Sequence, residues 1–474
     1  MLATPQQLMI AGPSFGGAVA VVGEHTSAKA AKRQLHTIAM LMEIGPAHTL
    51  ADAIRIFDPR RALEGEALRA FYAERGSDTR KKMRIHIEVT NGEPSSMLFT
   101  GHGGSGKSTE LNKLVEELDK EYLVVKVCTS DIVAYDDLTY VDVVLIMAMA
   151  LFRAASDEQL IQRAPAQIAE EVWRQVRQMI ENVIFGHQPT RPSTSNEASL
   201  NLSIPKTIFG LTLEFEARFK SEEDTRAKIR ERLRDNLSEV INKANRLIEE
   251  IQRRHRLPVL LIAEDTDKPD PGRAREIFFE HPQSLTAFKA LTIYTFPVAL
   301  RYNAQFIELD RYFKIFRMPN LALVHKDGTI NRRSWRVLGE VIHRRLDPAL
   351  IAPKARQTII RASGGIMRLL IGLVQSAATN AHARGAQRIE NSDAMAAVAD
   401  LRKDFIAALK SEDYPILAAR YKDKRLSNDD ALQPLLQTRA LLEYENDDTW
   451  CDVHPAILPL LEERVAGFKI NESA

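Results

Sequence analysis

Apolar runs and amphipathic stretches alternate along the first two thirds of the chain. Four runs have the length and the residue types of buried strands: residues 96–100, 122–129, 258–263 and 291–297. Between the first two, apolar residues recur at helical spacing at Leu111, Leu114, Val115 and Leu118. A strand, a helix and a second strand in succession imply a right-handed crossover. The pattern therefore predicts an α/β fold with a parallel sheet.

A long region, residues 156–255, interrupts this alternation. Residues 159–184 and 221–254 carry apolar side chains at helical spacing, and the breaker-rich residues 186–198 predict a loop. Residues 200–220 instead alternate apolar and polar positions about Phe209 and Gly210, which predicts a β-hairpin. We expect a mainly helical insert in the core.

The ends of the chain differ from the centre. Residues 28–44 predict a helix of unknown role, and residues 58–76 predict a turn followed by a helix that ends in glycine. The second segment either covers a bound base or is a plain packing helix. Towards the other end, four helices are predicted in series: residues 335–345, 354–362, 367–383 and 392–409.

Composition limits the class of protein. A chain of 474 residues predicts two to four domains, and its net charge of +1 gives no overall field that would favour nucleic acid. Cys128 and Cys451 lack metal-ligand spacing and do not suggest a disulfide framework. The apolar residues 8–22 are interrupted by Pro13 and by glycines, which argues against a signal peptide or a membrane helix. We expect a cytoplasmic protein without membrane contact.

The first apolar run leads into the phosphate-binding pattern G-x-x-x-x-G-K-[ST], from Gly101 to Ser108. Glycines let the backbone approach a triphosphate, Lys107 would lie between its β and γ phosphates, and Ser108 would bind Mg²⁺. The alternative is a chance match in a glycine-rich loop, against which the flanking strand and helix argue. The predicted ATP-binding residues here are Gly101, Gly103, Gly104, Ser105, Gly106, Lys107, Ser108 and Thr109.

The third apolar run ends in carboxylates, as a Walker B segment does. One carboxylate at a strand end can hold Mg²⁺ while its neighbour orients the attacking water. We assign Glu264 mainly to the metal and Asp265 mainly to the water, although the two roles could be exchanged. Asp267 is a third acid without an assigned role. Together with Lys107 these residues form the predicted catalytic set.

Two polar residues complete the pattern. Thr295 lies in the fourth run, where it could sense the γ-phosphate, and Arg368 lies one turn into a helix that follows Gly364 and Gly365. In this order the motifs resemble the AAA+ and STAND group of P-loop ATPases, especially origin-recognition-like and bacterial switch ATPases. The resemblance covers roughly residues 55–470 and implies that Thr295 is sensor 1 and Arg368 the sensor 2 arginine of an α-helical lid. Arg301 and Arg311 are candidates for an arginine finger, and an ordinary surface arginine is the alternative for each.

The resemblance divides the chain as follows: an N-terminal extension (1–55), a P-loop NTPase core (56–330, with the insert at about 156–255), a helical lid (331–410) and a C-terminal winged-helix-like domain (411–474). The last assignment rests on two predicted helices and a short hairpin. Within this domain His454 is expected to be structural rather than a ligand. Glu-Asp in place of the commoner Walker B order, and Thr in place of Asn at sensor 1, predict slow turnover.

Two functions remain open at this point. The first is an ATPase that binds Mg²⁺ and ATP and switches a protein partner or a homo-oligomer. The second is a nucleotide-gated module with little turnover, whose C-terminal domain binds DNA or protein. A P-loop kinase is a weaker third hypothesis, because the lid and tail match no acceptor-binding arrangement.

Overall fold

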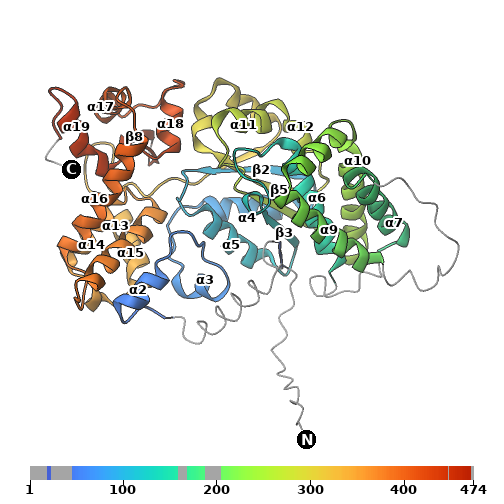
Figure 1. The fold of residues 1–474 in the computed structure, drawn as a ribbon, viewed down its shortest axis with the longest axis horizontal. Coiled ribbons are helices and arrows are strands. Elements are labelled where there is room, and N and C mark those ends of the chain that lie inside the picture. The colour runs from blue at the N-terminus through green and yellow to red at the C-terminus, as the bar shows by residue number, and fades with distance from the viewer. Residues whose placement is uncertain (1–18, 23–44, 158–167, 187–203, 447, 471–474) are drawn as a thin grey trace, which may run out of the picture.

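The computed structural model describes residues 19–22, 45–157, 168–186, 204–446 and 448–470 (Figure 1). The predicted helix at residues 28–44 and nearly all of the predicted loop at residues 186–198 lie outside this range. No helix within the described residues is long and apolar enough to cross a membrane.

A parallel sheet forms the centre of the larger body, in the order β1-β3-β4-β5-β2-β6. Every pair of neighbouring strands is parallel. The strands are β1 (Val19–Val22), β3 (Leu123–Cys128), β4 (Val259–Glu264), β5 (Leu291–Pro297), β2 (Ser95–Gly101) and β6 (Lys314–Arg317). The predicted α/β fold with a parallel sheet is confirmed. The first and third predicted strands, β2 and β4, are not neighbours, because β5 lies between them.

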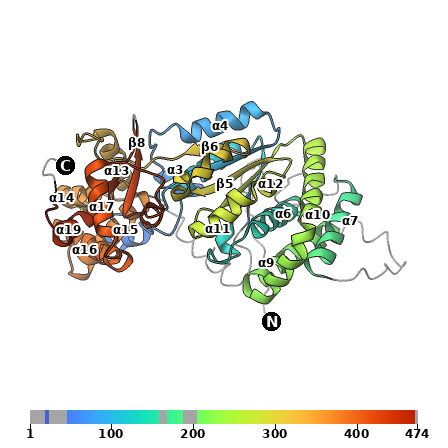
Figure 2. The ribbon, with the colours of Figure 1, turned by 90° about the horizontal axis from the view of Figure 1, so that it is seen from above.

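Alternate residues of β2, β3, β4, β5 and β6 face two separate cores. Leu260 and Ile262 pack with α4 (Thr79–Thr90) and α5 (Lys107–Leu118), whereas Leu261 packs with the helices of the opposite face. There α6 (Tyr140–Ser156) is buried almost throughout, because the insert covers it. Figure 2 shows α4 on one side of the sheet and α6 on the other.

The insert is helical, and the predicted hairpin is wrong for the described residues. It consists of α7 (Glu170–Met179), a π-helical segment (Ile180–Ile184), α9 (Ile204–Ser221) and α10 (Glu223–His255). In α9 the buried positions are Ile204, Pro205, Ile208, Thr212, Phe215 and Phe219, and from Ile204 onward, apart from Pro205, they recur every three or four residues. The apparent alternation arose from half-buried side chains beside this stripe. Gly210 lies inside the helix with open space around it, and the chain does not turn there.

The predicted lid helices are present as α13 (Arg332–His343), α14 (Pro353–Ala362), α15 (Met367–Ala383) and α16 (Asn391–Ala408). They share one core with α2 (Leu50–Ile56), which comes from the N-terminal side of the nucleotide-binding core. Gln375 in α15 donates a hydrogen bond to the carbonyl of Ile54 at 2.8 Å. The segment from Ala47 to Phe57 therefore packs as part of the lid.

The C-terminal domain has α17 (Asp413–Asp423), α18 (Leu432–Gln437) and an antiparallel hairpin of β7 (Leu441–Glu445) and β8 (Thr449–Val453), followed by α19 (Leu458–Arg464). Two helices and a hairpin occur in the order predicted. The short helices α3 (Gly65–Phe71), α11 (Pro271–Arg275) and α12 (Pro282–Leu285) connect the larger elements. In both views the C-terminal domain lies beside the lid (Figures 1 and 2).

Candidate nucleotide site

The phosphate loop connects the end of β2 at Gly101 with the start of α5 at Lys107. Gly104 and Gly106 have φ angles of 82° and 103°, a region that side chains rarely adopt. A Cβ on Gly104 would also lie 2.7 Å from the Cβ of Arg368. The glycines thus serve both the turn of the loop and the close approach of the lid.

Lys107 lies beneath this loop with 5 % of its side chain exposed. Its ammonium donates hydrogen bonds to the carbonyls of Gly101 at 2.7 Å and His102 at 3.1 Å. It also forms an ion pair of 2.8 Å with Asp267. Burial lowers the pKa of Lys107, and the charge of Asp267 opposes this effect.

Asp267, which the sequence left without a role, is therefore the carboxylate that faces the loop lysine. Its side chain is 3 % exposed and also lies 3.1 Å from the ammonium of Lys268. Burial favours the neutral acid, but the charges of Lys107 and Lys268 outweigh it and hold the pKa of Asp267 below its ordinary value. Asp267 is thus an anion shared by two lysines.

Glu264 and Ser108, the two residues predicted to hold Mg²⁺, are in hydrogen-bond contact. Burial raises the pKa of Glu264, and it is opposed by the charge of Lys126, 3.3 Å away, and by a hydrogen bond from Ser108. A hydroxyl and a carboxylate oxygen are hard donors of the kind Mg²⁺ prefers, usually with several waters. These two residues fit the ion, and its charge would favour the ionised form of Glu264.

Asp265 contacts the end of the neighbouring strand β3. Its carboxylate accepts hydrogen bonds from the Ser130 hydroxyl at 2.7 Å and from the Cys128 thiol at 3.1 Å. Its φ of 63° is unusual for a residue other than glycine. Burial and the charge of Asp265 raise the pKa of Cys128 above its ordinary range, so the thiol stays protonated and donates.

Thr295 on β5 is buried and faces the Walker B segment. Thr266 donates a hydrogen bond to the Thr295 carbonyl at 2.6 Å, and the two hydroxyls lie 3.2 Å apart. The predicted sensor 1 residue therefore contacts the residue between Asp265 and Asp267. Its hydroxyl links β5 to the acidic turn.

The lid closes against the phosphate loop through Arg368. The Arg368 N–H donates to the carbonyl of Gly104 at 2.9 Å, and its side chain is exposed. Burial lowers the pKa of Lys268, but the charges of Asp267 and Asp265 outweigh it and raise the pKa, and the charge of Arg368 opposes this rise. The start of α15 is thus close to the loop, as expected of a lid.

The segment before α4 supplies a buried arginine that the sequence did not reveal. Arg75 donates to the carbonyl of Ser105 in the phosphate loop, and to the carbonyl of Pro319 at 3.1 Å. Burial lowers its pKa against the charge of Glu110. Leu63, in the preceding residues, donates its N–H to the hydroxyl of Thr109 at 3.3 Å. The segment at residues 58–76 therefore covers the first turn of α5.

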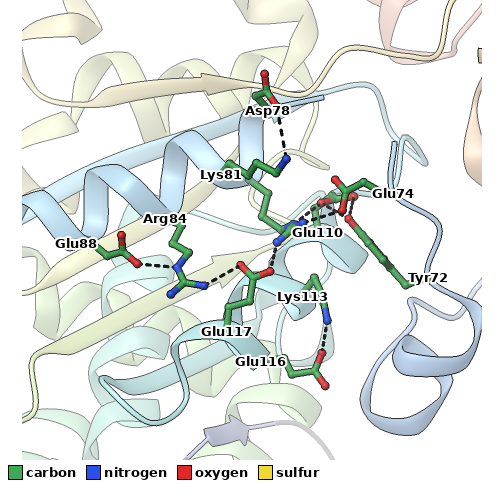
Figure 3. Close-up of polar contacts among 11 residues, drawn as sticks. Tyr72, Glu74, Asp78, Lys81, Arg84, Glu88, Glu110, Lys113, Glu116 and Glu117 are labelled. Carbon is green, nitrogen blue, oxygen red and sulfur yellow. Dashed lines mark hydrogen bonds and ion pairs between the residues drawn. The ribbon is translucent and has the colours of Figure 1, made fainter. Parts of the chain in front are cut away.

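An ionic cluster lies between α4 and α5, and Glu74, the residue before Arg75, belongs to it (Figure 3). Arg80 lies 3.2 Å from Glu110 and 3.0 Å from Glu74, and it also pairs with Glu117. The Tyr72 hydroxyl donates to Glu110 at 3.1 Å. Arg75 follows Glu74 directly, so the cluster holds the chain next to the residue that contacts the loop.

The C-terminal hairpin contacts the phosphate loop directly. The N–H of Glu443 in β7 donates to Nε2 of His102 at 2.7 Å. Because Nε2 accepts, a neutral His102 carries its proton on Nδ1. Burial and the charge of Lys107 lower the pKa of His102 to about 3. The loop histidine is thus neutral and is held by another domain.

The Glu443 side chain extends this contact to the segment after β5. It pairs with Arg301 and accepts a hydrogen bond of 2.5 Å from Tyr302. With 7 % of its side chain exposed, Arg301 is neither a surface arginine nor available to another subunit, so the arginine-finger hypothesis is wrong for it. Arg311 is exposed and remains a candidate. His454, expected to be structural, is buried, and burial lowers its pKa to about 3.

Lys126, His102, Arg75 and Glu443 were not identified as site residues from the sequence. Lys126 did carry a signal, since it is a lone charge inside an apolar strand, and His102 is a large residue within a glycine-rich loop. Arg75 and Glu443 carried none, because only the tertiary fold brings them to the loop.

No family model and no curated protein matches the sequence. Among solved structures, the chain is similar to a Walker-type ATPase of Pyrococcus abyssi, with 14 % identity, a TM-score of 0.43, and coverage of 86 % of this chain and 99 % of that one. The ORC1 protein of Aeropyrum pernix, solved in complex with DNA, has 11 % identity, a TM-score of 0.40 and coverage of 86 % and 96 %. The RuvB Holliday junction branch migration motor of Thermotoga maritima has 12 % identity, a TM-score of 0.37 and coverage of 87 % and 100 %.

The parallel sheet, the loop between β2 and α5 and the acidic end of β4 themselves define an α/β P-loop NTPase fold with a helical insert and lid. Lys107, Ser108 and Glu264 meet at the carboxyl ends of the strands, where ligands bind in open α/β sheets.

Proposed function

We propose that the protein binds Mg²⁺ and ATP, hydrolyses ATP slowly, and acts as an AAA+/STAND-like switch on a protein partner or on its own oligomer. The observation that carries the proposal is the convergence of Lys107, Ser108 and Glu264 beneath one glycine loop. Slow turnover agrees with the departures from the usual Walker B and sensor 1 residues. A cytoplasmic location belongs to the same proposal.

Each residue has a defined task in this proposal. Lys107 would exchange Asp267 for the β and γ phosphates, and Ser108 and Glu264 would hold Mg²⁺, which offsets phosphate charge. Asp265 would orient the attacking water and accept its proton. Arg368 would contact the γ-phosphate when α15 lies against Gly104, and Thr295 would hold the acidic turn.

A second candidate is the nucleotide-gated module with little turnover, whose C-terminal domain binds DNA or protein. One observation favours it: the Asp265 carboxylate is already bonded to Ser130 and Cys128. A carboxylate held in this way is a poor base for water until those bonds break. ATP would then act mainly through binding.

Calorimetry with Mg²⁺ and ATP, followed by a phosphate-release assay, tests both candidates. We expect the wild-type protein to bind ATP and Lys107→Ala to lose binding, whereas Lys120→Ala, in the exposed turn after α5, retains it. Binding with measurable release supports the ATPase, and binding without release supports the gated module. Absence of ATP binding by the wild-type protein contradicts both.

A further inference from the structure

Arg439 lies in the turn between α18 and β7 and has two unusual features. Its φ is 66°, which is rare outside glycine, asparagine and aspartate. Its Nε is buried without a hydrogen-bond partner, and no carboxylate among the described residues pairs with its guanidinium. A largely buried arginine without an acceptor is costly, and such groups are normally paired.

The residues around Arg439 contact the nucleotide site on two sides. On the preceding side, Gln437 donates to the carbonyl of Pro269, just after the acidic turn, at 3.4 Å. On the following side, the N–H of Glu443 donates to His102 in the phosphate loop at 2.7 Å. The α18–β7 turn is therefore attached to the Walker B side and to the phosphate loop, and Arg439 lies between these attachments.

The lid lies on the third side of Arg439. Burial lowers the pKa of Arg439, and the nearby charge of Arg368 lowers it further. Arg368 also has no carboxylate partner among the described residues, while the acidic Asp267 is occupied by Lys107 and Lys268. Arg368 contacts the phosphate loop, and Arg439 lies in the turn that is attached to the same loop through Glu443. Neither guanidinium has a carboxylate partner among the described residues, and each is within range of the other's charge.

We propose that Arg439 binds a terminal phosphate of ATP, so that the C-terminal domain supplies one side of the nucleotide site. This inference rests on the proposed function, because it assigns a further residue to the same site. An anion between Arg439 and Arg368 would remove their mutual repulsion and give both guanidiniums acceptors. ATP would then tie the C-terminal domain to the lid and to the phosphate loop.

The test compares Arg439→Asn with Arg439→Lys. Asparagine tolerates the left-handed backbone and removes the charge, whereas lysine keeps a cation. Arg256→Asn is the matched control, because Arg256 has a φ of 54°, is exposed and lies between α10 and the start of β4, at the opposite end of that strand from Glu264. We expect Arg439→Asn to weaken Mg²⁺–ATP binding by about tenfold or more in calorimetry, Arg439→Lys to weaken it less, and Arg256→Asn to leave it unchanged.

A second measurement uses the wild-type protein and needs no variant to fold. The protein is treated with phenylglyoxal, which modifies arginine, with and without Mg²⁺ and ATP, and labelling of Arg439 is read by mass spectrometry. Protection of Arg439 by ATP supports the proposal. Equal labelling in both samples, or an ATP affinity of Arg439→Asn equal to that of the wild type, overturns it. If the wild type binds no ATP, the proposed function fails as well. If the wild type binds ATP but neither the labelling of Arg439 nor its substitution by Asn is linked to that binding, this inference alone fails.

Discussion

The ammonium of Lys107 lies 2.8 Å from a carboxylate oxygen of Asp267, and both side chains are almost fully buried. The lysine that would bind phosphate thus already has an anion from its own chain. Any phosphate that enters the loop exchanges one negative partner of Lys107 for another. The affinity for ATP therefore depends on how strongly Asp267 holds the lysine.

Asp267→Asn is expected to destabilise the ligand-free protein and to increase the stabilisation that ATP provides. Removing one partner of a buried pair leaves Lys107 uncompensated, which costs about 3 kcal/mol in the free energy of unfolding. Phosphate would then restore a counter-charge that the wild type already has. Urea unfolding with and without Mg²⁺–ATP measures both effects.

The matched control is Asp310→Asn, which changes an exposed carboxylate outside the site and should alter neither quantity. If ATP stabilises Asp267→Asn and the wild type by equal amounts, Asp267 does not compete with phosphate for Lys107.

His102 predicts a pH dependence of stability that originates in the phosphate loop. Its pKa is about 3 in the folded protein, against an ordinary value of 6.5, because burial and the charges of Lys107, Arg439 and Arg301 disfavour the imidazolium. The unfolded chain therefore binds a proton first as the pH falls. This contribution to the free energy of unfolding is complete above about pH 6.5 and is lost progressively as the pH falls towards 3. By pH 5 the loss is about 2 kcal/mol.

His102→Gln should remove that part of the pH dependence, since a glutamine carbonyl can still accept from the N–H of Glu443 but does not titrate. The measurement is the difference between the free energies of unfolding at pH 7 and pH 5. His454, whose pKa is also lowered to about 3, is unchanged in the variant and leaves a residual dependence. An unaltered difference would show that His102 does not stay neutral on folding.

The contacts of Asp265 predict that two conservative substitutions have opposite effects on phosphate release. Asp265→Asn should retain ATP binding and lose phosphate release, because an amide cannot accept a proton from water. Ser130→Ala should raise the rate of release, because it removes the 2.7 Å hydrogen bond that occupies the carboxylate. Single-turnover assays with matched nucleotide occupancy compare them.

The variant Glu264→Gln tests which Walker B carboxylate holds the metal and which orients the attacking water. With Glu264 on the metal, this variant should weaken Mg²⁺-dependent binding. If it instead binds Mg²⁺–ATP normally and only loses release, while Asp265→Asn loses Mg²⁺, the two acids have exchanged roles.

The sequence predicted those parts of the site that are local in the chain. The loop from Gly101 to Ser108 and the acidic end of β4 are each defined by consecutive residues, and the structure places them together because parallel strands end at one edge. Contacts between distant segments left no such pattern. The bond between His102 and Glu443 joins residues 341 positions apart, so only packing of the C-terminal hairpin reveals it.

The wrong prediction of a β-hairpin where α9 forms has a different physical origin. Half-buried apolar residues on both flanks of a helical stripe mimic alternation over a short window, as they do near Phe209. Burial against α6 and α10, rather than local preference, decides the structure there.

The last prediction concerns Arg368, whose backbone N–H bonds to Gly104 and whose guanidinium has no carboxylate partner among the described residues. A charge-assisted hydrogen bond to the γ-phosphate is available with ATP and not with ADP. Arg368 would therefore supply the differential affinity that any ligand-driven switch requires. Arg368→Ala should bring the affinities for ATP and ADP together, through a loss of about tenfold for ATP alone, and should flatten any ATP-dependent change in oligomer size.

Calorimetry with both nucleotides and light scattering of the same samples measure this outcome. Arg336→Ala, an exposed arginine of lid helix α13, is the control for loss of a lid charge and should preserve the preference for ATP. If Arg368→Ala still prefers ATP to the same extent as the wild type, the residue lies on the lid surface only, and contact of α15 with the loop does not report the γ-phosphate.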